Sequence, residues 1–284
     1  MKFGFSIKHV LTFTLLLTAF NGFTQQSIID ANLVTEFNNG LKLYNNKAYA
    51  AAQKKFDKVT KNYKPNTSIK TDASYYNAMC AVKLNQTDAD EKVLSFVEEN
   101  PTSNKKNKAF FNVGNYYFAN KKAAHSLKWF KKVNTDLLSE ENRKELNFKM
   151  GYGLLVSKKL TLAKDKFLPL INDAKYGNDS RYYYGFIAYK LEDYGIAAST
   201  LKEIEDNESY KSEISYYLLD ISFKAGQFKR CVDVGLQLLK SAKRKDISEI
   251  SKIVGESYFN LKKYEESIPY LKAYKGKANK WNNT

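Results

Sequence analysis

The sequence predicts an all-α protein made of about seven stacked helix pairs. Three observations support this prediction: turn-forming residues are scarce, apolar residues recur at helical spacing, and one pattern of small and bulky residues returns about every 36 residues. The 284 residues include only 13 Gly and 4 Pro, whereas a β-sandwich or barrel needs turn residues about every 8–12 positions. Apolar residues make up 43% and charged residues 27%, which is the balance of a folded globular protein.

The N-terminal segment 1–24 is predicted to be a cleaved signal peptide. Two lysines precede an uncharged apolar run, Val10 to Phe20, that is too short to span a bilayer. Gly22 and Thr24 are small residues ahead of Gln25, and no Cys lies near this point, so the signal is not that of a lipoprotein. We therefore expect export to the periplasm or the outer-membrane periphery. The alternative is a buried helix of the folded domain.

One pattern of five positions recurs along the rest of the chain, residues 25–284. In its clearest copy, Gly114 is followed by Tyr117, Ala123, Ser126 and Phe130. The first position of each copy stands at residues 40, 78, 114, 151, 185, 219 and 255, so successive copies are 34 to 38 residues apart. The predicted repeats are centred on 40–59, 78–97, 114–133, 151–170, 185–204, 219–238 and 255–274. A period this regular is typical of a repeat architecture.

Each copy predicts two antiparallel helices joined by a short polar turn. The first helix carries a small residue where the second must approach, and the second carries a small residue and, four residues later on the same face, a bulky one. Five copies follow this pattern closely. The copies that begin at Ala78 and Leu219 are degenerate, the latter ending on Gly235. Because no pair buries its apolar face alone, neighbouring pairs must stack.

The pattern and the period resemble the tetratricopeptide repeat (TPR) family over about residues 33–275. The resemblance implies a right-handed α-α superhelix, a TPR-like solenoid, whose first helices line a concave surface that holds peptides or partner helices. Two features depart from the family. Most copies lack the proline that usually closes the second helix, with Pro65 and Pro101 the nearest equivalents, and several periods exceed the family's usual length of about 34 residues.

The resemblance also points to candidate partner-binding residues on the first helices of repeats three to six. They are Phe111, Asn115, Phe118, Tyr152, Leu155, Tyr182, Phe186, Tyr189, Tyr216, Asp220 and Phe223. Aromatic side chains there offer a large contact area at low entropic cost. The alternative is that they fill the packing between repeats. The aromatic residues around Asn115 do not match the clamp that grips a C-terminal carboxylate in some TPR arrays.

Lysine pairs at the predicted turns form a second candidate surface. Lys121-Lys122, Lys158-Lys159 and Lys262-Lys263 recur at the repeat period, so they would lie along one edge. The net charge of +16, or about +14 without residues 1–24, favours acidic partners. Anionic polysaccharide, lipopolysaccharide and a membrane periphery stay open as partners, as does a solvated edge with no partner. Nucleic acid is not expected, since the chain carries no nucleic-acid-binding motif.

The sequence contains no pattern for catalysis, a metal or a cofactor. It has two histidines and lacks the GxSxG, GxxxxGK, HExxH and CxxC motifs. Adjacent acids such as Glu140-Glu141 point about 100° apart on a helix, so they do not form an acid/base couple. Cys80 and Cys231 are expected to be buried free thiols. We therefore expect no enzyme and no cofactor, but a protein–protein interaction scaffold of the cell envelope.

The C-terminal segment, Lys275 to Thr284, is polar and contains a single Trp281. At the observed period, the first position of another repeat would fall near residue 290. A solenoid needs a polar cap on its last apolar face. We expect either that Trp281 folds over this face, or that a longer array, a partner or a second copy covers it.

Overall fold

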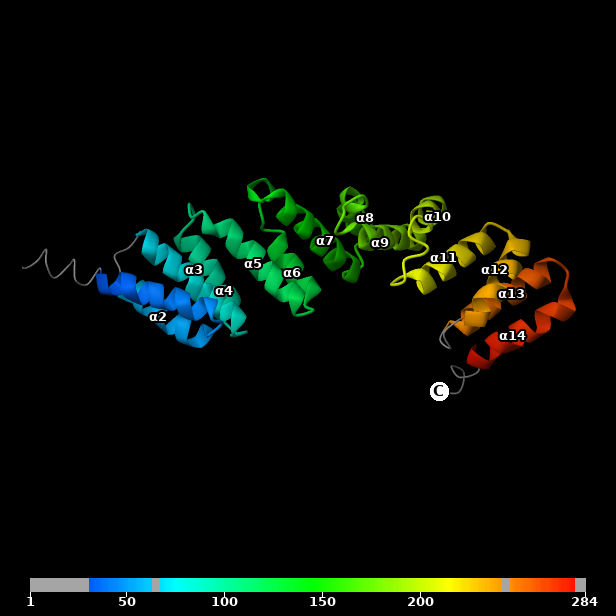
Figure 1. Cartoon of the computed structure of the whole chain (residues 1–284), viewed down its shortest axis with the longest axis horizontal. Coiled ribbons are helices and arrows are strands. Elements are labelled where there is room, and N and C mark those ends of the chain that lie inside the picture. The colour runs from blue at the N-terminus through cyan, green and yellow to red at the C-terminus, as the bar shows by residue number, and fades with distance from the viewer. Residues whose placement is uncertain (1–30, 63–66, 242–245, 279–284) are drawn as a thin grey trace, which may run out of the picture. The chain divides into compact units, whose positions relative to one another are not determined.

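The structure, a computed structural model, describes residues 31–62, 67–241 and 246–278. Within these ranges it contains fourteen α-helices and two short 3₁₀ helices and no strand (Figure 1). The predicted all-α, TPR-like fold of about seven helix pairs is therefore confirmed. The predicted signal peptide and Trp281 lie outside the described residues.

The chain divides into two compact units, the first reaching Leu137 and the second starting at Leu138. The first unit contains a helix over 31–45, then α2 (Tyr49–Asn62), α3 (Ser68–Lys83), α4 (Ala89–Glu99), α5 (Lys105–Ala119), α6 (Ala123–Phe130) and η1 (Thr135–Leu137). The second contains α7 (Glu140–Val156), α8 (Leu160–Phe167), η2 (Leu168–Leu170), α9 (Gly177–Lys190), α10 (Tyr194–Lys202), α11 (Lys211–Lys224), α12 (Phe228–Ser241), α13 (Ile247–Asn260) and α14 (Tyr264–Ala278). Each predicted repeat supplies one pair of consecutive helices, three pairs in the first unit and four in the second.

The glycine at the first position of a repeat lies directly under the bulky side chain at its fifth position. A Cβ added at Gly151 would lie 2.9 Å from Cζ of Phe167, and one at Gly185 would lie 2.7 Å from Cγ of Leu201. The same contact joins Gly40 to Phe56, Gly114 to Phe130 and Gly255 to Leu271. A side chain on the first helix would occupy the space of the second helix's core residue. Glycine is needed at these positions because the helices approach closely.

The sixth repeat exchanges the two sizes. Leu219 stands at its first position and Gly235 at its fifth, so the bulky residue is on α11 and the glycine is on α12. A Cβ added at Gly235 would overlap the side chain of Val254 on α13, and would lie 3.8 Å from Cδ1 of Leu219. The register predicted from the sequence holds here, and the copy is degenerate only in which helix carries the glycine.

A residue in the left-handed conformation ends the first helix of every pair. These residues are Lys47, Asn85, Lys121, Lys158, Glu192, Gly226 and Lys262, with φ between 52° and 71°. In the fourth repeat the N–H of Lys158 donates to the Leu155 carbonyl (2.9 Å) and the next N–H, of Lys159, donates to the Leu154 carbonyl (2.9 Å). The other six turns have the same two hydrogen bonds. Each turn is therefore a Schellman motif, which satisfies carbonyls that a helix end leaves free.

Both cysteines are buried free thiols, as predicted. Cys80 packs among Ala52 and Phe56, and Cys231 packs among Leu219 and Val254. Burial raises the pKa of the Cys80 thiol to about 12. A thiol with so high a pKa is a structural rather than a reactive cysteine.

Candidate functional site

The eleven residues predicted to bind a partner lie on α5, α7, α9 and α11. Phe111 is buried against the ring of Phe130, with centroids 6.3 Å apart, so it serves the core of the first unit. Asn115 and Phe118 on the same helix are half-buried. The other eight residues lie in the second unit and are also half-buried. Half-buried side chains both pack between repeats and keep one side for contact.

In the second unit, several of these residues form one aromatic network across neighbouring repeats. The rings of Tyr182 and Phe186 are stacked with centroids 6.4 Å apart, and Tyr182 stacks more closely on Tyr210 at 4.0 Å. The hydroxyl of Tyr189 on α9 donates to Oδ2 of Asp220 on α11, at 2.7 Å. The structure therefore brings the predicted residues of repeats five and six together.

Two tyrosines outside the predicted set, Tyr183 and Tyr217, hold this network together. Tyr217 on α11 contacts Phe186 (5.7 Å) and Tyr189 (4.8 Å) on α9. Tyr183 on α9 contacts Tyr152 on α7 (5.7 Å) and stacks on the buried Phe167 (5.2 Å). Each stands two residues before the first position of its repeat, and Tyr76 stands at the equivalent position of the second repeat. An aromatic residue that recurs at this repeat position is the signal that could have identified them.

Charged groups border the aromatic network. Nζ of Lys190 lies 5.5 Å from the ring centroids of both Phe186 and Tyr189, close enough for a cation–π contact. Burial and the hydrogen bond to Asp220 raise the pKa of Tyr189. Its hydroxyl therefore stays protonated at neutral pH and acts as a hydrogen-bond donor. The surface of α9 and α11 thus offers aromatic area edged by charges of both signs.

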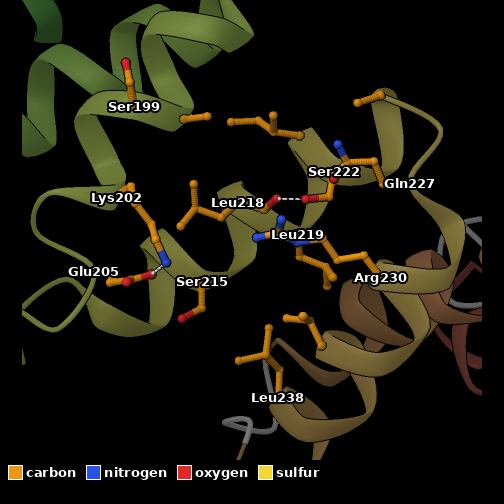
Figure 2. Close-up of a pocket in the computed structure, with 14 residues that line it drawn as sticks. Ser199, Lys202, Glu205, Ser215, Leu218, Leu219, Ser222, Gln227, Arg230 and Leu238 are labelled. Atoms are coloured by element: carbon orange, nitrogen blue, oxygen red, sulfur yellow. Dashed lines mark hydrogen bonds and ion pairs between the residues drawn. The ribbon is translucent and has the colours of Figure 1, made fainter.

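Apart from the aromatic network, a hollow opens in the sixth repeat, where α10 and α12 flank α11 (Figure 2). Its volume is about 520 Å³. We call it the sixth-repeat groove. It is lined by Ala198, Ser199, Lys202 and Glu205 from α10 and the turn after it, by Ser215, Leu218, Leu219, Ile221, Ser222 and Ala225 from α11 and its end, and by Gln227, Arg230, Val234 and Leu238 from α12 and its start. No sequence prediction pointed to this groove.

The groove exists because its walls carry small side chains and one wall is short. Ala198, Ser199, Ser215, Ser222 and Ala225 all face it. On the α10 side the helix begins where the Asp193 carboxylate accepts the N–H of Ile196, and it ends nine residues on at Lys202. α12 has 14 residues. At about 1.5 Å per residue, α12 is longer than α10 by roughly 7 Å, so α10 leaves part of α11 uncovered.

The lysines predicted to form one edge are exposed at their turns within each unit. Lys121, Lys158 and Lys262 are all solvent-exposed, and each is the left-handed residue of its turn. Exposed apolar side chains accompany the lysines at two turns of the second unit, Val156 at 53% and Phe259 at 57% exposure. The edge is therefore both basic and partly apolar.

The described part of the chain contains neither a cluster of metal ligands nor a helix able to span a membrane. Within it, no group of three or more His, Cys, Asp or Glu side chains is placed to hold a metal ion. None of its helices combines the length and the apolar composition needed to cross a bilayer. The arrangement can bind other molecules through its surfaces, and nothing in it indicates a reaction.

Comparison with known proteins supports the fold. No protein-family model and no curated protein matches the sequence. Solved structures of MamA, a TPR protein, are similar to the chain. MamA AMB-1 has a TM-score of 0.52 at 12% identity, over 61% of this chain and 92% of its own. MamA MSR-1 has a TM-score of 0.51 at 13% identity, over 62% of this chain and 99% of its own.

Proposed function

We propose that the chain is a non-enzymatic protein–protein interaction scaffold of the cell envelope, which binds a partner protein or peptide along its first-helix surface. The observation that carries this proposal is the half-buried aromatic network of α9 and α11, edged by Lys190 and Asp220. Tyrosines that stay neutral provide contact area and a hydrogen-bond donor at low entropic cost. The TPR-like fold is consistent with this use, and the absence of a catalytic motif in the sequence favours binding over catalysis.

Site-specific crosslinking tests which surface binds. A photoreactive phenylalanine analogue replaces Phe186, and the same analogue replaces Leu162 on α8, which is 54% exposed, as the matched control. We expect a discrete partner to be crosslinked in envelope extract from position 186 and not from position 162. Equal labelling from both positions, or no discrete product from position 186, would refute a first-helix binding surface.

The envelope location is a separate part of the proposal. It rests on the signal-like segment 1–24 and predicts a mature protein that begins at Gln25. Cell fractionation and N-terminal sequencing test it. An intact N-terminus on protein recovered from the cytoplasm would refute the location and leave the binding surface unaffected.

The basic, partly apolar edge favours a second candidate function, the binding of anionic glycan or lipopolysaccharide. Such binding would weaken steeply between low and physiological salt, because exposed charges are screened within about 8 Å at physiological ionic strength. Replacing Lys158 and Lys159 by Gln should weaken it further. If glycan binding is insensitive to both salt and these substitutions, the edge is not the site.

A further inference from the structure

We propose that the sixth-repeat groove binds an amphipathic helix of a partner protein, one that carries acidic residues beside its apolar face. The groove is distinct from the first-helix surface of the proposed function. On α11, the predicted binding residues Tyr216, Asp220 and Phe223 share one face, whereas Ser215, Leu218 and Ser222 share another, at the same helical spacing. The second set lines the groove and the first does not.

The floor of the groove is apolar. Leu218 and Ile221 from α11 and Val234 and Leu238 from α12 line it, and Leu218, Val234 and Leu238 are only half-buried. Figure 2 shows Leu218 and Leu238 on this lining. The volume of about 520 Å³ lies within the range of about 300–1,000 Å³ that ligand sites have. A partner's apolar side chains would therefore gain free energy by displacing water from this floor.

The groove is also long enough for several helical turns. It shares Ser215 and Leu238 with a further hollow of about 380 Å³, and Gln227, Arg230 and Val234 with a shallow one of about 780 Å³. Residues of α12 line all three hollows, and its 14 residues span about 21 Å. This length matches an amphipathic helix of three to four turns, which places apolar residues at i, i+3, i+4 and i+7.

A helix fits this lining better than an extended peptide. An extended segment exposes backbone N–H and C=O groups that need partners once they are buried. Gln227 is the only carboxamide among the groove's lining residues, and the other uncharged polar groups are three serine hydroxyls, too few to pair with a whole extended backbone. A helix satisfies its own backbone groups internally, so it can be buried against an aliphatic floor without that cost.

The rim of the groove favours acidic residues on the partner. Among the described residues, the Arg230 guanidinium makes no hydrogen bond or ion pair, and the side-chain amide of Gln227 and the hydroxyl of Ser215 make no hydrogen bond. Lys202 lies across the groove from Arg230, and its Nζ is 2.6 Å from Glu205 (Figure 2). Glu205, the single carboxylate of the first hollow, thus already has a cation, whereas Asp233, Glu208 and Asp246 line the two further hollows. Arg230 can bind an incoming carboxylate with two parallel hydrogen bonds, and the chain's net charge of +16 would speed the encounter.

A synthetic helix tests the proposal on the full chain. The probe is a fluorescent, end-capped alanine-based peptide of about 18 residues, long enough to be helical, with leucines along one face and glutamates on both sides of them. One control peptide has the same residues in scrambled order, and another has lysine in place of each glutamate. Fluorescence anisotropy with the purified protein should show saturable binding of the glutamate helix alone. If the scrambled or the lysine peptide binds as tightly, the proposal is wrong.

Variants of the protein locate the site. Arg230→Glu reverses the rim charge and Ala225→Trp fills the groove from an exposed position, and each should weaken binding by about tenfold or more. Lys240→Glu makes the same charge change at an exposed position of α12 that lines none of the three hollows, and should leave binding unchanged. Thermal unfolding confirms that each variant is folded. If the glutamate helix binds both groove variants as it binds the original chain, the groove is not its site.

Discussion

Replacing Gly151 by Ala should destabilise the protein, although alanine is the better helix former. The new Cβ would lie 2.9 Å from Cζ of Phe167, whose side chain is fully buried and cannot swing into solvent. Overpacking of this kind costs about 1–3 kcal/mol. The gain in helix propensity returns at most about 1 kcal/mol. The net change is a loss of up to about 2 kcal/mol.

Gly195 provides the matched control on α10. A Cβ added there meets no heavy atom within 4 Å, so Gly195→Ala should be neutral or stabilising by up to about 1 kcal/mol. Because helix propensity contributes to both substitutions, the difference between the two isolates the overpacking, about 1–3 kcal/mol. Gly151→Leu and Gly114→Leu should cost more still, and far more than a turn substitution such as Lys158→Ala.

Urea unfolding followed by circular dichroism at 222 nm measures these differences. Repeat arrays often unfold in more than one step, so free energies are compared only between variants whose transitions have the same slope. The packing explanation fails if Gly151→Ala is as stable as Gly195→Ala, because the difference between the two variants isolates the overpacking.

Three further predictions follow from the turns, the thiols and the tyrosines. The left-handed turn residue should prefer glycine, so Gly226→Ala should cost about 1 kcal/mol and Lys158→Gly should gain up to about 1 kcal/mol in urea unfolding; a loss of stability on Lys158→Gly would contradict this. Because burial raises the pKa of both thiols, Cys80 and Cys231 should react with a thiol reagent only when the protein unfolds, and rapid labelling of the native protein would show that one is accessible. Burial raises the pKa of Tyr183 from its usual 10 to about 12, so the unfolded chain loses this proton first and stability should fall as the pH rises from 10 to 12. Tyr183→Phe should reduce that fall, and an unchanged pH profile would argue against the shift.

The fold could be predicted from the sequence because the contacts that define a repeat are local. The first and fifth positions are sixteen residues apart in the same helix pair, so one pattern fixes the register and the helix packing together. In all five close copies the glycine lies under the predicted bulky residue, such as Gly255 under Leu271. The left-handed turn residues could not be predicted in the same way, since six of the seven are lysine, asparagine or glutamate and only Gly226 carries the usual sequence signal.

The binding surface could be predicted only in part, because neighbouring tyrosines compete for the contact between repeats. Tyr182-Tyr183 and Tyr216-Tyr217 are adjacent pairs whose members point about 100° apart. The sequence predicts a binding role for the first of each pair, Tyr182 and Tyr216. The structure places the second, Tyr183 and Tyr217, in contact with aromatic residues of the preceding repeat. Which of two adjacent tyrosines contacts the neighbouring repeat depends on the relative orientation of the two repeats, and this orientation cannot be read from a single sequence.

The exchanged sizes in the sixth repeat act together with the small wall residues and the short α10 to open the groove. Gly235 lets Val254 of α13 occupy the space where a side chain on α12 would stand, so α12 packs closely on α13. A Cβ added at Gly235 would overlap Val254 on α13 but would lie 3.8 Å from Cδ1 of Leu219 on α11. α12 therefore approaches α11 less closely than it approaches α13. In the other repeats, a bulky fifth residue such as Phe167 or Leu201 fills the space between the two helices of a pair. With that residue replaced by glycine, α12 shifts its closest packing to α13, and the apolar surface of α11 between α10 and α12 stays open to a partner.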